Sequence, residues 1–82
     1  MPTDLRVGKF RVLILFPPRE HAPPHVHVVS AGGIAVITLA HNANKQRTMR
    51  LEGMTRADAR QAERIVADHT TQLLEQWRLI HG

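Results

Sequence analysis

The apolar residues of this chain recur at two different spacings, and the spacing changes near Thr55. Before Thr55, short apolar segments alternate or run without interruption, as β-strands do, and turn residues separate them. After it, apolar residues recur every three or four positions, as on one face of a helix. The pattern predicts an α+β fold, a three- or four-stranded antiparallel meander packed on one long C-terminal helix.

Turn residues set the limits of the predicted strands. Pro17-Pro18 ends the first strand, because proline lacks the N–H donor that a strand ladder needs. Gly32-Gly33 suits a tight hairpin turn, because glycine adopts positive φ at no steric cost. The predicted strands are residues 9–16, 25–30, 34–40 and 48–52.

The predicted helix begins after Thr55 and extends to about Ile80. The Thr55 hydroxyl is expected to cap the first turn, with Asp58 three residues on as a short variant of the capping box. Because His69 falls on the apolar stripe, its imidazole is expected to point toward the sheet. Trp77 is most simply a core residue. The stripe consists of Ala62, Ile65, Val66, His69, Leu73, Trp77 and Ile80.

The length of 82 residues allows one small α+β domain, over residues 1–82. A core of this size supplies roughly 3–5 kcal/mol of net stability. The chain has no cysteine, so any metal site must use His, Asp, Glu or water. The N-terminus lacks a basic region followed by a hydrophobic one, and the apolar segments are too short to span a membrane. We therefore expect a soluble cytoplasmic protein with no membrane contact.

The formal net charge is +4, from eleven Lys and Arg against seven Asp and Glu. This balance favours an anionic partner, either nucleic acid or an acidic protein surface. A modest positive charge also serves simply to keep a small domain soluble. With two Phe, one Trp and no Tyr, the chain is poorly supplied for base stacking, so RNA contacts would depend on arginine and histidine.

Three of the six histidines lie in one short segment, His21-Ala22-Pro23-Pro24-His25-Val26-His27. Because side chains alternate across a strand, His25 and His27 are expected on one face, about 7 Å apart at Cα. The two prolines lower the entropic cost of holding His21 near them. Imidazole titrates near neutral pH and is the commonest metal ligand. This segment is therefore the candidate functional site.

Three interpretations of the segment are open. In the first, two imidazoles act on an RNA phosphodiester, one taking the proton of a 2′-hydroxyl and the other protonating the leaving oxygen. In the second, His21, His25 and His27 bind a divalent metal such as zinc and leave one position open for water. In the third, the histidines have a purely structural role in the Pro-rich bend and the core.

Further residues join the candidate site from outside the segment. His69 adds a fourth imidazole to the candidate catalytic set, and Glu20 is a candidate for orienting an imidazole. His41 and His81 have no supporting context. Glu20 also suits an ordinary solvated surface, and so do the arginines that are candidate phosphate contacts. The candidate phosphate contacts are Arg19, Arg56, Arg60 and Arg64.

The motif resembles a family of short prokaryotic proteins known as domain of unknown function 4160. The likeness runs from about Lys9 to Trp77. It rests on the Glu-His-x-Pro-Pro-His-x-His segment, the Gly-containing turn that follows, and a C-terminal helix with His69 and Trp77. The resemblance implies an association with toxin–antitoxin modules, in which a second small protein is encoded nearby.

Taken with the basic charge, the resemblance favours a toxin-like protein that acts on RNA through His21, His25, His27 and His69. The alternative is a non-enzymatic partner-binding module of the antitoxin, adaptor or inhibitor type, whose histidine motif is structural or holds a divalent metal. A meander with an unprotected edge strand also allows pairing into a homodimer.

Overall fold

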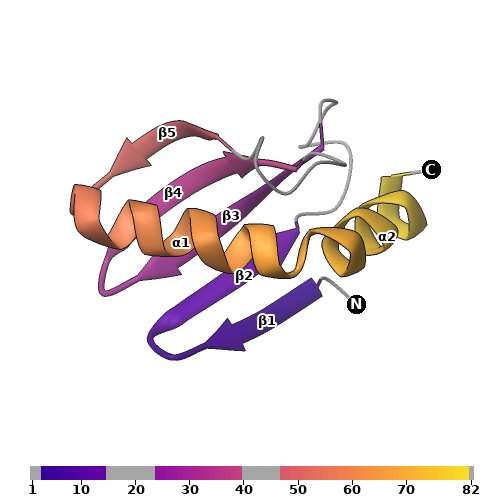
Figure 1. The fold of residues 1–82 in the computed structure, drawn as a ribbon, viewed down its shortest axis with the longest axis horizontal. Coiled ribbons are helices and arrows are strands. Elements are labelled where there is room, and N and C mark those ends of the chain that lie inside the picture. Colours follow the sequence, from indigo (N-terminus) through magenta and orange to yellow (C-terminus); the bar gives the residue numbers. More distant parts are fainter. Residues whose placement is uncertain (1–2, 15–23, 40–46, 82) are drawn as a thin grey trace.

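The computed structural model describes residues 3–14, 24–39 and 47–81. Figure 1 shows a sheet with α1 lying across one face and α2 continuing beyond it. The five strands are antiparallel and follow one another across the sheet in sequence order. The meander is therefore confirmed, with five strands rather than three or four and two helices rather than one. The elements are β1 (Thr3–Val7), β2 (Phe10–Ile14), β3 (His25–Ser30), β4 (Gly33–Thr38), β5 (Thr48–Glu52), α1 (Arg56–Asp68) and α2 (Thr70–His81).

Strand β1 is the element that the sequence pattern does not predict. Among the side chains of β1 that the structure describes, Leu5 and Val7 pack against the core, so its alternating pattern is short. Val7 pairs with Phe10, and Gly8 takes φ +57° in the two-residue turn between them. A glycine-containing two-residue turn is the sequence signal for this hairpin.

The turn between β3 and β4 lies one residue earlier than expected. Ala31 and Gly32 occupy it, with φ values of 44° and 83°, whereas Gly33 is the first residue of β4. Two successive positive φ values give the turn whose twist matches an antiparallel hairpin. Gly33 is constrained by packing instead, because a Cβ there would lie 2.5 Å from the carbonyl oxygen of Gly53.

Strand β5 is tied to α1 by a carboxylate. The backbone N–H and the hydroxyl of Thr48 both donate to Glu63 Oε2, at 3.0 and 2.6 Å. Between β4 and β5 the register shifts after Val36, so that Val36 pairs with Arg50 and Ile37 with Thr48. The shift is a β-bulge, which bends the strand locally.

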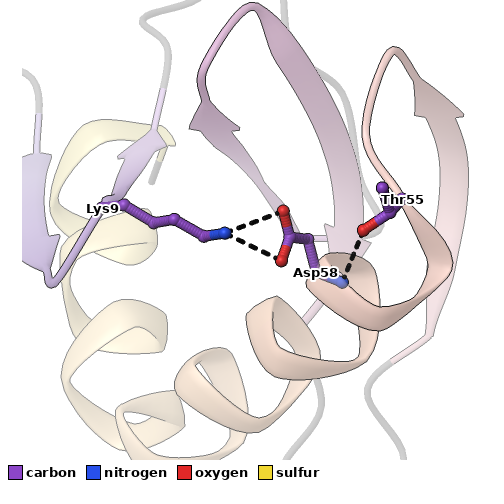
Figure 2. Close-up of polar contacts among 3 residues, drawn as sticks. All are labelled: Lys9, Thr55 and Asp58. Atoms are coloured by element: carbon purple, nitrogen blue, oxygen red, sulfur yellow. Dashed lines mark hydrogen bonds and ion pairs between the residues drawn. The ribbon is translucent and has the colours of Figure 1, made fainter.

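The start of α1 agrees with the predicted cap. The Asp58 N–H donates to the Thr55 hydroxyl at 3.1 Å. The Asp58 carboxylate accepts from Lys9 Nζ, at 3.0 Å to each oxygen, as Figure 2 shows. Lys9 comes from the turn between β1 and β2, so this ion pair joins the first hairpin to the first turn of α1.

The prediction of one long C-terminal helix is wrong, because the helix is interrupted at His69. This residue has φ −118° and ψ 17°, and its N–H bonds to the Val66 carbonyl, three residues back, at 3.2 Å. Its ring Nδ1 lies 2.9 Å from the Ile65 carbonyl oxygen. A carbonyl oxygen only accepts, so Nδ1 carries the proton and donates. In a regular helix the His69 N–H would donate to the Ile65 carbonyl. Here the His69 imidazole donates to that carbonyl instead.

The two faces of the sheet differ in composition. One face packs against the helices and forms the core, which contains Phe10, Val12, Ile14, Val26, Val28, Ala35, Ile37, Leu39, Ala62, Ile65, Val66, Leu73, Leu74 and Trp77. The alternate residues lie on the opposite side, which we call the outer face. By register, the outer face carries Arg6, Arg11, Leu13, His25, His27, Val29, Ile34, Val36, Thr38, Arg50 and Glu52. Neither helix of the described chain is long and apolar enough to cross a membrane.

Candidate histidine site

The two histidines of β3 share one face of the strand, as the sequence pattern predicts. Val26 and Val28 are fully buried in the core, whereas His25 and His27 are half-buried on the outer face. Their ring centroids are 5.7 Å apart, and the rings are inclined at 60°. The alternation of the strand therefore brings two imidazoles close together without removing either from solvent.

Helix α2 extends this pair into a row of four rings. The Trp77 ring lies 5.3 Å from that of His25, and the His81 ring stacks on Trp77 at 3.8 Å with an interplanar angle of 24°. We call His27, His25, Trp77 and His81 the ring row. Because Trp77 is only 7% exposed and belongs to the core, it fixes one side of the His25 imidazole.

Sequence reasoning left two members of the ring row out of the site, Trp77 as a core residue and His81 for lack of supporting context. The spacing of four residues between Trp77 and His81 places both on one side of α2, which is the signal that could have found His81. His81 also lies with Arg78 in the last turn of α2. The negative end of a helix dipole stabilises positive charge there, so this end of the site suits a cation.

The surroundings of His27 combine apolar and basic side chains. Leu13 of β2 and Val36 of β4 lie directly across from it. The Nδ1 atom of His27 is buried. Arg11 is exposed on the same face and pairs with Val29, one alternation along the strand from His27. Diagonal neighbours of this kind are roughly 7–8 Å apart, within reach of an arginine side chain.

The other predicted site residues are distributed differently. Glu20, His21 and Arg19 lie outside the described residues. His69 is half-buried at the break between the helices and bonds to Ile65, as described above, so its catalytic role stays a prediction. The arginines at four-residue steps are exposed on α1, whose apolar side packs on the other face of the sheet. They are Arg56, Arg60 and Arg64.

The metal interpretation depends on a residue that the structure does not describe. Within residues 3–14, 24–39 and 47–81, no group of three or more His, Cys, Asp or Glu side chains could hold a metal ion. His25 and His27 supply two imidazoles, and the third predicted ligand is His21. A three-histidine site therefore stays a prediction.

Comparison with curated proteins and with solved structures gave no match for this chain. A comparison with protein families gave a match over residues 10–78, which include all five strands except β1, both helices through Arg78, and the His25–His27 pair. That match covers well over half of the chain. The chain belongs to the family described as Domain of unknown function (DUF4160).

Proposed function

We propose that this protein cleaves RNA by metal-free acid–base catalysis, with His25 and His27 as the proton-transferring pair. The observation that carries the proposal is the pair itself: two half-buried imidazoles on one strand face, with ring centroids 5.7 Å apart. Imidazole is the side chain best suited to accept and donate protons near neutral pH. Two such groups a few ångströms apart can act on opposite sides of one phosphate.

The proposed reaction needs no other reactant than the RNA. One imidazole takes the proton of a ribose 2′-hydroxyl, whose oxygen then attacks the adjacent phosphorus. The other, protonated, imidazole donates its proton to the departing 5′-oxygen as the P–O bond breaks. The products are a 2′,3′-cyclic phosphate and a 5′-hydroxyl, and the two imidazoles have exchanged protonation states. The sequence of steps follows general acid–base catalysis.

Neighbouring residues support this chemistry in two ways. Arg11, on the same face and one alternation from His27, is placed to contact a phosphate oxygen and offset its charge. Trp77 acts as a positioning residue, because its ring packs 5.3 Å from that of His25 and limits the orientations of the imidazole. The net charge of +4 favours association with RNA in general.

The biological setting that fits this activity is the toxin-like component of a toxin–antitoxin-type module. A small protein encoded nearby would then bind the basic chain and hold the activity in check. Mixing the two proteins should stop cleavage and raise the melting temperature of the complex, since a ligand of the folded state stabilises it by mass action.

The test is cleavage of a defined RNA by protein purified without a histidine tag. His25→Asn and His27→Asn keep a polar side chain with a hydrogen-bonding atom near the position of Nδ1, and they remove the titrating ring. Each is expected to lower the rate by about 10²–10⁴-fold, and the wild-type bell-shaped pH profile should lose one limb in each variant. Gln61→Ala, an exposed change on α1, is the matched control and should cleave normally. A DNA strand of the same sequence lacks the 2′-hydroxyl and should stay intact.

Three results would contradict the proposal. Unchanged cleavage in the double variant would place the activity elsewhere or in a contaminant. No cleavage by the wild-type protein at any pH would favour the second candidate, a non-enzymatic module that binds an acidic partner. Cleavage abolished by a chelator, together with near-stoichiometric zinc lost in the double variant, would favour the metal interpretation instead.

A further inference from the structure

Strand β5 is the last strand of the sheet, and in the described part of the chain no strand pairs with its other edge. Its side chains are unusually exposed for a strand: Met49 is 51% exposed and Leu51 36%. Arg50 and Glu52 form an ion pair at 2.9 Å, with 61% and 63% of their side-chain surfaces exposed. An open edge offers unpaired backbone N–H and C=O groups to another strand.

We propose that β5 pairs with β5 of a second copy of this chain, antiparallel and centred on Leu51. The argument is one of symmetry. A two-fold axis perpendicular to the sheet keeps every side chain on its own face, so the axis must pass through a residue that pairs with itself. The register is then decided by which residue occupies the axis.

Among the registers centred on Arg50, Leu51 or Glu52, charge selects one. With Arg50 or Glu52 on the axis, two like charges would face each other, which destabilises a strand pair. With Leu51 on the axis, Arg50 lies opposite the partner's Glu52, and Glu52 lies opposite the partner's Arg50. Both ion pairs then lie on the outer face.

The apolar contact falls on the other face of the sheet. Leu51 pairs with Ala35, a buried core residue, so its side chain lies on the face that packs against α1. In the proposed dimer it meets the partner's Leu51 there. One short strand pair buries little surface, so the dimer belongs to the weak class, with a dissociation constant in the micromolar range or above.

Charge reversal tests this arrangement with its own internal control. Arg50→Glu leaves two acids in β5, and Glu52→Arg leaves two basic residues. Each variant alone would face like charges at both pairs across the axis, so its dimer should be weakened at least about 10-fold. In an equimolar mixture, the two acids of one variant face the two basic residues of the other, so an ion pair forms at both positions. The mixture is therefore expected to form a heterodimer, and the double variant to regain the wild-type dissociation constant.

The measurement is sedimentation equilibrium over a concentration series, with circular dichroism to show that each variant is folded. Arg78→Glu, an exposed change on α2 with the same change in charge, is the matched control and should dimerise as the wild type does. A wild-type protein that stays monomeric at millimolar concentration would overturn the proposal. So would a dimer that neither single variant weakens, because that dimer would use another surface. RNA cleavage is not part of the readout, so the outcome does not depend on the proposed function.

Discussion

Gly33→Ala should destabilise the fold more than any other glycine substitution in the described chain, for a reason of space alone. An ideal Cβ on Gly33 lies 2.5 Å from Gly53 O, 2.7 Å from Gly53 C and 2.9 Å from Met54 Cβ. Two of these atoms are backbone and the third is attached to it, so no side chain can rotate away. Ordinary contact begins at 3.4 Å, so the segment after β5 must move by about 0.9 Å.

That movement reaches the first turn of α1. Thr55 follows Met54 directly, and its hydroxyl caps the helix by accepting the Asp58 N–H at 3.1 Å. Inserting an atom into a packed site costs about 1–3 kcal/mol, and disturbing a cap adds up to about 1. We expect the free energy of unfolding to fall by about 2–3 kcal/mol. For a domain of this size, that is a drop of roughly 10–20 °C in melting temperature.

Gly32→Ala separates steric crowding from backbone strain. Gly32 has φ +83° with nothing within 4 Å of an ideal Cβ, so alanine there is strained but not crowded. Its expected cost is about 1–2 kcal/mol. Urea denaturation followed by circular dichroism measures both variants, with the slope unchanged if only stability has changed. The reasoning is refuted if Gly33→Ala unfolds at the same urea concentration as the wild type, or later than Gly32→Ala.

Three further experiments test contacts around the helices. Thr55→Ala removes the cap hydroxyl and should lower the unfolding free energy by about 1 kcal/mol in urea denaturation, whereas an unchanged midpoint would mean that the cap adds nothing. In a double-mutant cycle, Lys9→Ala and Asp58→Ala should show a coupling of at most about 1 kcal/mol that shrinks at high salt; coupling that resists salt would contradict a surface ion pair. Trp77→Leu should lower stability by about 2–4 kcal/mol and shift the ring proton resonances of His25 in NMR spectra, and resonances that stay in place would show that Trp77 does not position that imidazole.

The strands that could be predicted are those whose residue pattern is complete within the segment. β3 and β5 have the predicted limits, because alternation and turn residues mark both ends of each. β1 is different: among its described side chains, Leu5 and Val7 are partly buried against the core, and the strand depends on pairing with β2 for its place in the sheet. The residue pattern of a segment indicates its preferred secondary structure, whereas a short strand forms because it pairs with a neighbouring strand.

The helix break could not be predicted from apolar spacing, because His69 fits the stripe on both sides of it. The break depends on a hydrogen bond from the His69 ring to the Ile65 carbonyl. This bond replaces the one that the His69 N–H would make in a regular helix, because that N–H donates to the Val66 carbonyl. The β-branched pair Thr70-Thr71 directly after His69 lowers helix propensity there, and it is the one local sign of a weak point. When a side chain replaces a backbone hydrogen-bond donor, the spacing of apolar residues in the sequence does not change.

Only the part of the candidate site that lies on one strand could be predicted. The His25–His27 pair follows from alternation in β3. The contact of Trp77 with His25 joins residues 52 positions apart in the sequence, and His81 enters the site only because α2 lies against the start of β3. Since the direction of α2 is set by the break at His69, the ring row is a consequence of tertiary structure.

The layering of the fold also decides which arginines can serve the histidine pair. Figure 1 looks down the shortest axis of the molecule, 21 Å long, with α1 across the sheet, so the exposed side of α1 and the outer face are separated along this axis. Screening at physiological salt acts over about 8 Å, which is less than half of this 21 Å extent. The arginines of the α1 stripe therefore cannot offset charge on a phosphate held between His25 and His27, although they can speed its encounter at low salt. Among the arginines of the outer face, Arg11 on the adjacent strand β2 lies nearer to His27 by register than Arg6 or Arg50, so it is the described arginine that best fits this role. The stripe on α1 is left for a different ligand.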